Sequence, residues 1–275
     1  MNIYEYLEGL SGGIVGVGVD ALTLTATGAK AKRELDKIIH TLGDEISHDR
    51  KKPFRFQKAQ GWSRGSVSYA DTRDIRRQRS WAILMVKGPL AGKIWMQAAV
   101  STLPKCTRVD ICVDVKMSKP DRRIVRKIRD GHKKRGTEML LIEGKGDTLT
   151  VGSRESSEYI RIYDKSEHYQ EELGNVWRFE VEYKRTMAQP VLELLAQGDA
   201  NQLMQDMVWH SMTKKHLPTP LIGNPVNIKG HKAAVSSPEQ KLLWIGRQVQ
   251  PTVTFLRQLG MEAEVLKALG LDNDV

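Results

Sequence analysis

Two alternating runs, joined by a short polar connection, constrain the fold of this chain more than any other feature. In the first run, two isoleucines alternate with Tyr159, Arg161, Tyr163 and Lys165. In the second, four large apolar side chains alternate with Arg178, Glu180, Glu182 and Lys184. Because a strand sends successive side chains to opposite faces, both runs predict strands with one apolar face. The opposite face carries a tyrosine, basic groups and carboxylates.

An earlier run, RVDICVDV at residues 108–115, has the same pattern. Its apolar set is Val109, Ile111, Val113 and Val115, and its other set is Arg108, Asp110, Cys112 and Asp114. If the three runs lie in one sheet, their apolar faces share a core and their polar faces share a surface. The sequence therefore predicts one surface that gathers a tyrosine, acids and arginines.

The overall composition indicates a globular protein with a polyanionic partner. The chain has 275 residues, 40% hydrophobic and 28% charged, which suffices for a sizeable core. A net charge of +10 favours nucleic acid as the partner. The two cysteines, Cys106 and Cys112, have no zinc-site spacing and fit a reduced, intracellular setting. Without a signal peptide or an apolar span, we expect a cytoplasmic protein with no membrane partner.

Local patterns predict a domain over residues 1–215, a linker over 216–236 that is rich in Pro, Gly and Asn, and a helical appendage over 237–275. Within the first domain, the glycines of residues 1–18 suggest a flexible lead-in, and residues 19–27 read as a strand. Residues 48–57 read as a basic loop, and residues 60–71 and 80–87 as strands. Residues 187–212 read as two helices with a break at Gly198.

Two basic clusters are candidate DNA contacts. The first, within residues 72–79, supplies Arg76, Arg77 and Arg79. The second, in a predicted helix within residues 119–136, supplies Arg122, Arg123, Arg126 and Lys127. Such clusters commonly contact phosphates in DNA-binding proteins, although an ordinary solvated surface has the same composition. The segment GPLAGK at 88–93 lacks the spacing of a nucleoside triphosphate loop, so hydrolysis of such a nucleotide is not predicted.

The predicted polar face suits phosphodiester transfer. A tyrosine oxygen can attack phosphorus and conserve the bond energy in a phosphotyrosine. Asp110, Asp114 and Glu180 are hard oxygen ligands suited to Mg²⁺ or Mn²⁺. Arg161 and Lys165 flank Tyr163 on its own face and could hold phosphate oxygens. Alternation by itself equally fits a solvated strand, so the pattern alone leaves both interpretations open.

The central stretch resembles the signature of the replication initiation factor (Rep_trans) family. The residues that carry the resemblance are GSRESSEYIRIYDK at 152–165, WRFEVEYK at 177–184 and the spacing of Arg108, Asp110 and Asp114. The resemblance covers roughly residues 19–200. It implies an α+β fold, an antiparallel sheet palm related to HUH endonucleases with helices on one face, to which the predicted C-terminal helical appendage is added.

The resemblance also implies a function: a rolling-circle replication initiator that nicks one strand of an origin hairpin or inverted repeat. The family's nucleophile corresponds to Tyr163, and its metal ligands correspond best to Asp110 and Asp114. Glu180 is the favoured third ligand, with Glu182 and Asp164 as alternatives. None of the seven histidines forms an HxH pair, which agrees with a carboxylate-held Mg²⁺ or Mn²⁺. Family members often form homodimers and recruit a host helicase.

Several alternatives stay open at this point. Tyr159, Tyr169 and Tyr183 are rival nucleophiles, although Tyr183 is predicted to face the core. A relaxase of a mobile element uses the same chemistry, and a non-catalytic origin-binding regulator could retain the fold. A single-stranded RNA-binding sheet fits less well, because it would need exposed aromatic side chains on the open face.

Overall fold

The structure is a computed structural model, and it divides into two compact units, residues 1–231 and 232–275. This division does not test the predicted boundaries at residues 215 and 236, which stay predictions. The description below covers residues 11–46, 50–56, 59–74, 79–101, 103–117, 124–131, 139–143, 147–166, 175–217, 226, 228, 250–258, 260, 261 and 264.

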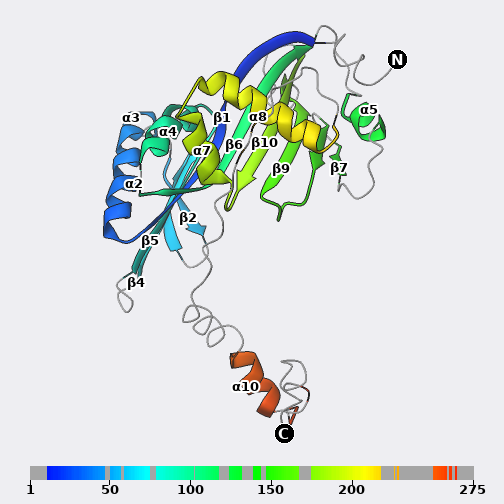
Figure 1. Cartoon of the computed structure of the whole chain (residues 1–275). Coiled ribbons are helices and arrows are strands. Elements are labelled where there is room, and N and C mark those ends of the chain that lie inside the picture. Colours follow the sequence, from blue (N-terminus) through cyan, green and yellow to red (C-terminus); the bar gives the residue numbers. More distant parts are fainter. Residues whose placement is uncertain are drawn as a thin grey trace. The chain divides into compact units, whose positions relative to one another are not determined.

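One antiparallel sheet organises the first unit (Figure 1). Its strand order is β2-β3-β4-β5-β1-β6-β10-β9-β8-β7, and every neighbouring pair is antiparallel. The strands are β1 (Ser11–Thr27), β2 (Lys52–Phe56), β3 (Ala59–Arg64), β4 (Val67–Asp74), β5 (Arg79–Lys87), β6 (Lys105–Met117), β7 (Met139–Ile142), β8 (Thr148–Val151), β9 (Glu158–Asp164) and β10 (Val176–Lys184). The three predicted alternating runs are therefore the adjacent strands β6, β10 and β9.

Helices pack against the apolar face of the sheet. They are α2 (Ala29–Thr41), α3 (Gly43–Ile46), α4 (Pro89–Val100), α5 (Ile124–Gly131), α7 (Ala188–Leu195) and α8 (Ala200–Lys214). In Figure 1, α7 and α8 cross the front of β6 and β10. The predicted break at Gly198 lies between α7 and α8, where Asp199 caps α8 by accepting hydrogen bonds from two backbone N–H groups. The α+β class and the layer of helices on one face are confirmed.

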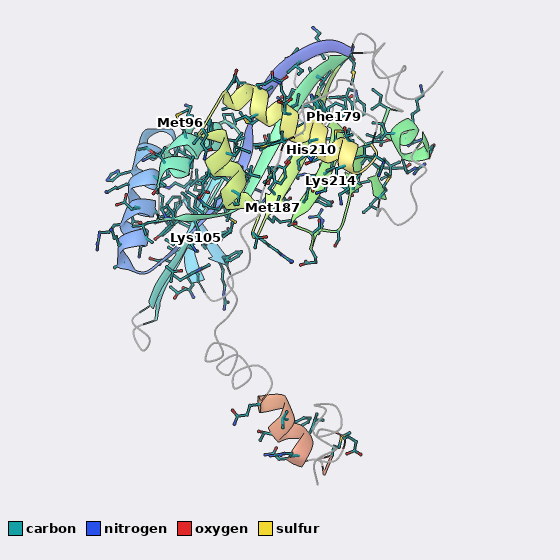
Figure 2. All side chains as sticks on the ribbon, viewed as in Figure 1. Met96, Lys105, Phe179, Met187, His210 and Lys214 are labelled. Carbon is teal, nitrogen blue, oxygen red and sulfur yellow. The ribbon has the colours of Figure 1, made fainter. Side chains whose placement is uncertain are left out.

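The hydrophobic core lies between these helices and the sheet. The odd-numbered residues of β6 from Val109 to Val115 are completely buried in it, as the alternation predicted. Phe179 of β10, labelled in Figure 2, packs edge-to-face on Trp209 of α8 with ring centroids 5.4 Å apart. Tyr183 also faces this core, where its hydroxyl pairs with Ser211 at 2.7 Å. The core thus fixes β6 and β10 in register and leaves their other face for polar side chains.

Strand β1 differs from the sequence prediction in both length and regularity. It begins at Ser11, so the glycine-rich segment predicted as a flexible lead-in is a strand from that residue onward. Its pairing with β6 shifts between Val19 and Ala21, so Asp20 is the extra residue of a β-bulge. The bulge changes which residues face the core, from Val19 on one side to Leu22 on the other. It thereby directs Asp20 toward the polar face.

Two further segments correct the local predictions. Residues 52–56, within the predicted basic loop, form the edge strand β2, which pairs with β3. The predicted strand over 60–71 is a hairpin, because β3 and β4 are separated by a turn at Gly65, whose φ is +50°. In the second unit, the described helix is α10 (Gln250–Gln258). Within the described part of the chain, no helix is long and apolar enough to cross a membrane.

Candidate active site

The polar face of β6, β10 and β9 is organised in rows across the strands. One row runs from Cys112 through Glu180 to Arg161. The adjacent row runs through Arg178, which pairs with Asp114 on β6 and with Tyr163 on β9. Since neighbouring strands lie about 4.8 Å apart, these rows hold the acids, the arginines and the tyrosine within a small area. The predicted gathering of these side chains on one face is therefore observed.

Tyr163 lies beside the acidic centre of this face, which is formed by Asp110 and Glu180. Its side chain is 6% exposed, and its hydroxyl donates a hydrogen bond to Oε2 of Glu180 at 3.4 Å. The hydroxyl is therefore on the same side of the sheet as the predicted acids and is not packed in the core. A pocket of about 440 Å³ opens beside it, lined among others by Asp20, Arg108, Asp110, Arg161 and Glu180.

Arg161 connects the two innermost acids. Its terminal nitrogen Nη2 donates to Oδ2 of Asp110 at 2.9 Å and also to Oε1 of Glu180. Asp110 is fully buried and accepts two further hydrogen bonds from Arg108. Among the described residues, Nε of Arg161 is the buried side-chain nitrogen that lacks a hydrogen-bond partner. This buried N–H is thus an unsatisfied donor at the centre of the acidic cluster.

The titration of Glu180 is strongly perturbed. Burial raises the pKa of Glu180 to about 8; the charge of Arg161 opposes this rise, and the charges of Asp110 and Asp20 add to it. Burial alone would lower the pKa of Arg161, but Glu180 and Asp110 outweigh that effect and raise it above its usual range. Arg161 therefore stays a cation beside a carboxylate whose proton affinity is elevated.

A second cluster lies next to this one and contains Asp114. Its carboxylate accepts hydrogen bonds from Nε and Nη2 of Arg178 at 2.7 and 2.9 Å, and from Nζ of Lys165 at 3.1 Å. Nη1 of Arg178 donates to Asp20. Burial would raise the pKa of Asp114, but the hydrogen bonds and charges of Arg178 and then Lys165 hold it below its usual range. Asp114 is thus an ionised acid fixed by two cations.

The predicted metal triad does not converge in this structure. Among the described residues, no three His, Cys, Asp or Glu side chains are placed to hold one metal ion. Asp110 and Glu180 come together at Arg161, whereas Asp114 belongs to the neighbouring cluster. This conformation does not show all three acids around one ion, and their role as metal ligands stays a prediction. Two carboxylates still fit Mg²⁺, because Mg²⁺ is usually held by one or two carboxylates together with substrate phosphates.

The alternative site residues have other surroundings. The ring of Tyr159 lies under the cations of Arg154 and Lys184, at 5.7 and 5.5 Å from the ring centroid. Glu182 is bound by Arg108 and Lys184 at 3.1 and 3.0 Å. Asp164 is buried and pairs with Trp177 in the strand register, which places it on the face opposite to Tyr163. Tyr169 lies outside the described residues.

The predicted DNA contacts are mostly outside the described structure. Arg76, Arg77, Arg122 and Arg123 lie outside the described residues, and only the backbone of Arg79, in β5, is described. Arg126 and Lys127 lie on α5. Arg126 is 47% exposed but forms ion pairs with Glu143 and Asp147. Its role in binding DNA stays a prediction.

Sequence reasoning missed Asp20 and the bridging role of Arg178. The signal for Asp20 was present: apolar residues occupy odd positions up to Val19 and even positions from Leu22 onward. Such a change of phase within one strand marks a β-bulge, and bulges often redirect a side chain beside an active site. The role of Arg178 depends on its two partners, on β1 and β6, which alternation within β10 could not reveal.

This geometry is that of an α+β palm, one antiparallel sheet with helices on one face and a tyrosine among acids and arginines on the other. The chain matches the replication initiation factor family over residues 104–269, which is more than half of its length, and it belongs to that family. Its fold is similar to the solved structure of a rolling circle replication initiator protein from Geobacillus stearothermophilus. The TM-score is 0.53 at 16% identity, and the match covers 84% of this chain and 96% of that chain. A comparison with curated proteins gave no match.

Proposed function

We propose that this protein initiates rolling-circle replication by nicking one DNA strand through a phosphotyrosine intermediate on Tyr163. The observation that carries the proposal is the hydrogen bond from the Tyr163 hydroxyl to Oε2 of Glu180 at 3.4 Å, beside Arg161 and a pocket of about 440 Å³. A nucleophile, a side chain that orients its hydroxyl and a cation for phosphate therefore lie together. Family membership supports the replication context.

The reaction that we propose is a transesterification. The oxygen of Tyr163 attacks the scissile phosphorus, and the bond from phosphorus to the 3′ oxygen of the preceding nucleotide breaks. The phenolic proton leaves to solvent while Oε2 of Glu180 orients the hydroxyl, and the departing 3′ oxygen takes a proton from solvent to become a hydroxyl. The 5′ phosphate is then joined to Tyr163, and the free 3′ hydroxyl can prime synthesis. No net hydrolysis occurs, so the phosphotyrosine bond can be used for rejoining.

Arg161 is placed to hold the phosphate during this reaction. Its side chain is 31% exposed and lines the pocket, so the guanidinium can donate to a nonbridging phosphate oxygen while Nη2 keeps its contact with Glu180. Asp110 and Glu180 would hold a divalent cation, with phosphate oxygens completing its coordination. When bound, that ion supplies positive charge that stabilises the pentavalent phosphorus and the departing oxygen. Asp114 instead fixes Arg178 and Lys165, so any contact of Lys165 with phosphate requires a change of partner.

The remaining partners follow from the family and from charge. Origin DNA with a hairpin or inverted repeat is the proposed substrate, because a net charge of +10 favours a polyanion. A homodimer, a host helicase, and a cytoplasmic location stay predictions. The identity of the ion, Mg²⁺ or Mn²⁺, stays open as well.

The test is incubation with a supercoiled plasmid that carries the protein's origin, in Mn²⁺ and in EDTA. We expect relaxation with protein bound covalently to the 5′ end in Mn²⁺. Tyr163→Phe should lose the covalent product and retain DNA binding, and the control Tyr183→Phe should keep both activities because Tyr183 faces the core. Tight binding by the wild-type protein without any nicking would instead indicate a non-catalytic origin-binding protein.

A further inference from the structure

A second hollow on the polar face lies beside the proposed active site. It has a volume of about 370 Å³, within the range of small-ligand sites, and lies where β1 passes β6 and the start of α4. Glycines create it: Gly16 pairs with Asp114 and Gly18 pairs with Cys112, so neither β1 residue fills the space above β6. Gly92, in the first turn of α4, lines the other side.

The hollow adjoins the pocket beside Tyr163. Asp20, Gly88 and Pro89 line both cavities. Arg178 lines the hollow and is the cross-strand neighbour of Tyr163. The β6 floor of the hollow is two strands from β9, or about 10 Å at the usual strand spacing. A nucleotide one or two positions from a phosphate at Tyr163 is therefore within reach of the hollow.

The charges of the hollow favour a neutral polar ligand over a second phosphate. Lys165 and Arg178 supply two positive charges, which Asp114 and Asp20 match through ion pairs. A phosphate would gain little net attraction there. A nucleobase carries both hydrogen-bond donors and acceptors, which a carboxylate and a guanidinium can read. A bare glycine backbone also allows a flat ring to approach closely.

We propose that this hollow binds one unpaired base of the nicked strand and thereby selects which phosphate reaches Tyr163. This inference rests on the proposed nicking function and adds the subsite that positions the strand. A base held in a duplex cannot enter it, so the hollow selects single-stranded or extruded DNA. Asp114 and Arg178 are the positioning and specificity residues of this subsite.

Gly18→Leu tests the proposal, because a Cβ built at Gly18 meets no atom within 4 Å and the new side chain would occupy the hollow. Gly18→Ala is a smaller version that fills less of it. Gly43→Leu is the matched control, since a Cβ there also meets nothing within 4 Å and Gly43 lies in α3, outside the residues that line the hollow. Thermal melting checks that each variant folds.

The readout is fluorescence anisotropy with single-stranded 20-mers of dT, dC and dA and with an abasic 20-mer, in a Tyr163→Phe background that cannot react. We expect at least one base-bearing strand to bind about tenfold more tightly than the abasic strand. Gly18→Leu should remove that preference and leave abasic binding unchanged, whereas Gly43→Leu should keep it. Equal binding of all strands by the parent protein, or an unchanged preference in folded Gly18→Leu, would overturn the proposal.

The covalent assay separates this result from the proposed function. With Tyr163 restored, adduct formation on the origin strand reports nicking alone. Adduct formation without any base preference would refute the subsite and leave the nicking function intact. A base preference without an adduct would refute nicking and leave a base-binding hollow on a DNA-binding protein.

Discussion

Replacing Arg161 by Gln should expose how strongly the acidic centre depends on one cation. In the native protein, Arg161 bonds both Asp110, which is fully buried, and Glu180, which is 1% exposed. At pH 9, above the pKa of about 8 that burial gives Glu180, removal of Arg161 leaves two buried carboxylates close together beside Arg108. Removing one partner of a buried ion pair typically costs about 3–5 kcal/mol. Because the Arg161 side chain is 31% exposed, we expect the low end of this range, about 3 kcal/mol. For a chain of this size, that lowers Tm by roughly 6–12 °C.

The assay is urea unfolding in EDTA, arranged as a double-mutant cycle with Glu180→Gln. Because Glu180→Gln removes the uncompensated charge, adding it to Arg161→Gln should recover at least about 1 kcal/mol. Arg129→Gln is the control, since Arg129 pairs with Asp130 on the surface and should change stability by less than about 0.5 kcal/mol. A loss below about 1 kcal/mol for Arg161→Gln, or strictly additive effects, would refute the reasoning.

Three further predictions concern packing, pH and metal. Phe179→Ala should lower the unfolding free energy by about 3–5 kcal/mol in urea titrations, because Phe179 is fully buried against α8; a loss under about 1 kcal/mol would contradict this packing. Burial raises the pKa of the Cys106 and Cys112 thiols, so their contribution to stability is complete below the unfolded value near 8.5 and falls as pH rises above it, by up to about 1.4 kcal/mol per pH unit each. Urea titrations from pH 8 to 10 should show this fall in the free energy of unfolding, and a variant with alanine at both positions should show a smaller fall. Equal slopes of stability against pH in the two proteins would contradict the raised pKa of the thiols. Finally, Mn²⁺ should raise the Tm of the wild-type protein more than that of Glu180→Gln, and an equal rise in both would place the ion elsewhere.

The sequence sufficed to predict the elements in which one local pattern determines the outcome. Alternation in β6, β9 and β10 identified the polar face, because in a strand each residue's face follows from its position. Alternation also predicted that Tyr183 lies in the core and Tyr163 on the opposite face. These predictions depend only on neighbours along the chain.

Other features depend on contacts between distant segments, and local patterns did not reveal them. Asp110 and Asp114 lie four residues apart on β6, about 13 Å at the usual rise of a strand, so the strand itself separates them. The two cations that hold Asp114, Arg178 and Lys165, come from distant segments, which its local pattern did not reveal. The basic residues of β2 predict a loop, yet they form a solvated edge strand because they pair with β3. The glycines of β1 suggested flexibility, whereas in the sheet they leave the hollow beside the proposed site open.

The most direct test of the account is a peptide map of the protein after reaction with its origin DNA. If the Tyr163 hydroxyl is the nucleophile, the nucleotide adduct lies on the tryptic peptide of residues 162–165, whose sole tyrosine is Tyr163. An adduct on the peptide of residues 155–161 would instead make Tyr159 the nucleophile and would contradict this account. Relaxed plasmid with no adduct on any tyrosine would contradict the phosphotyrosine mechanism itself.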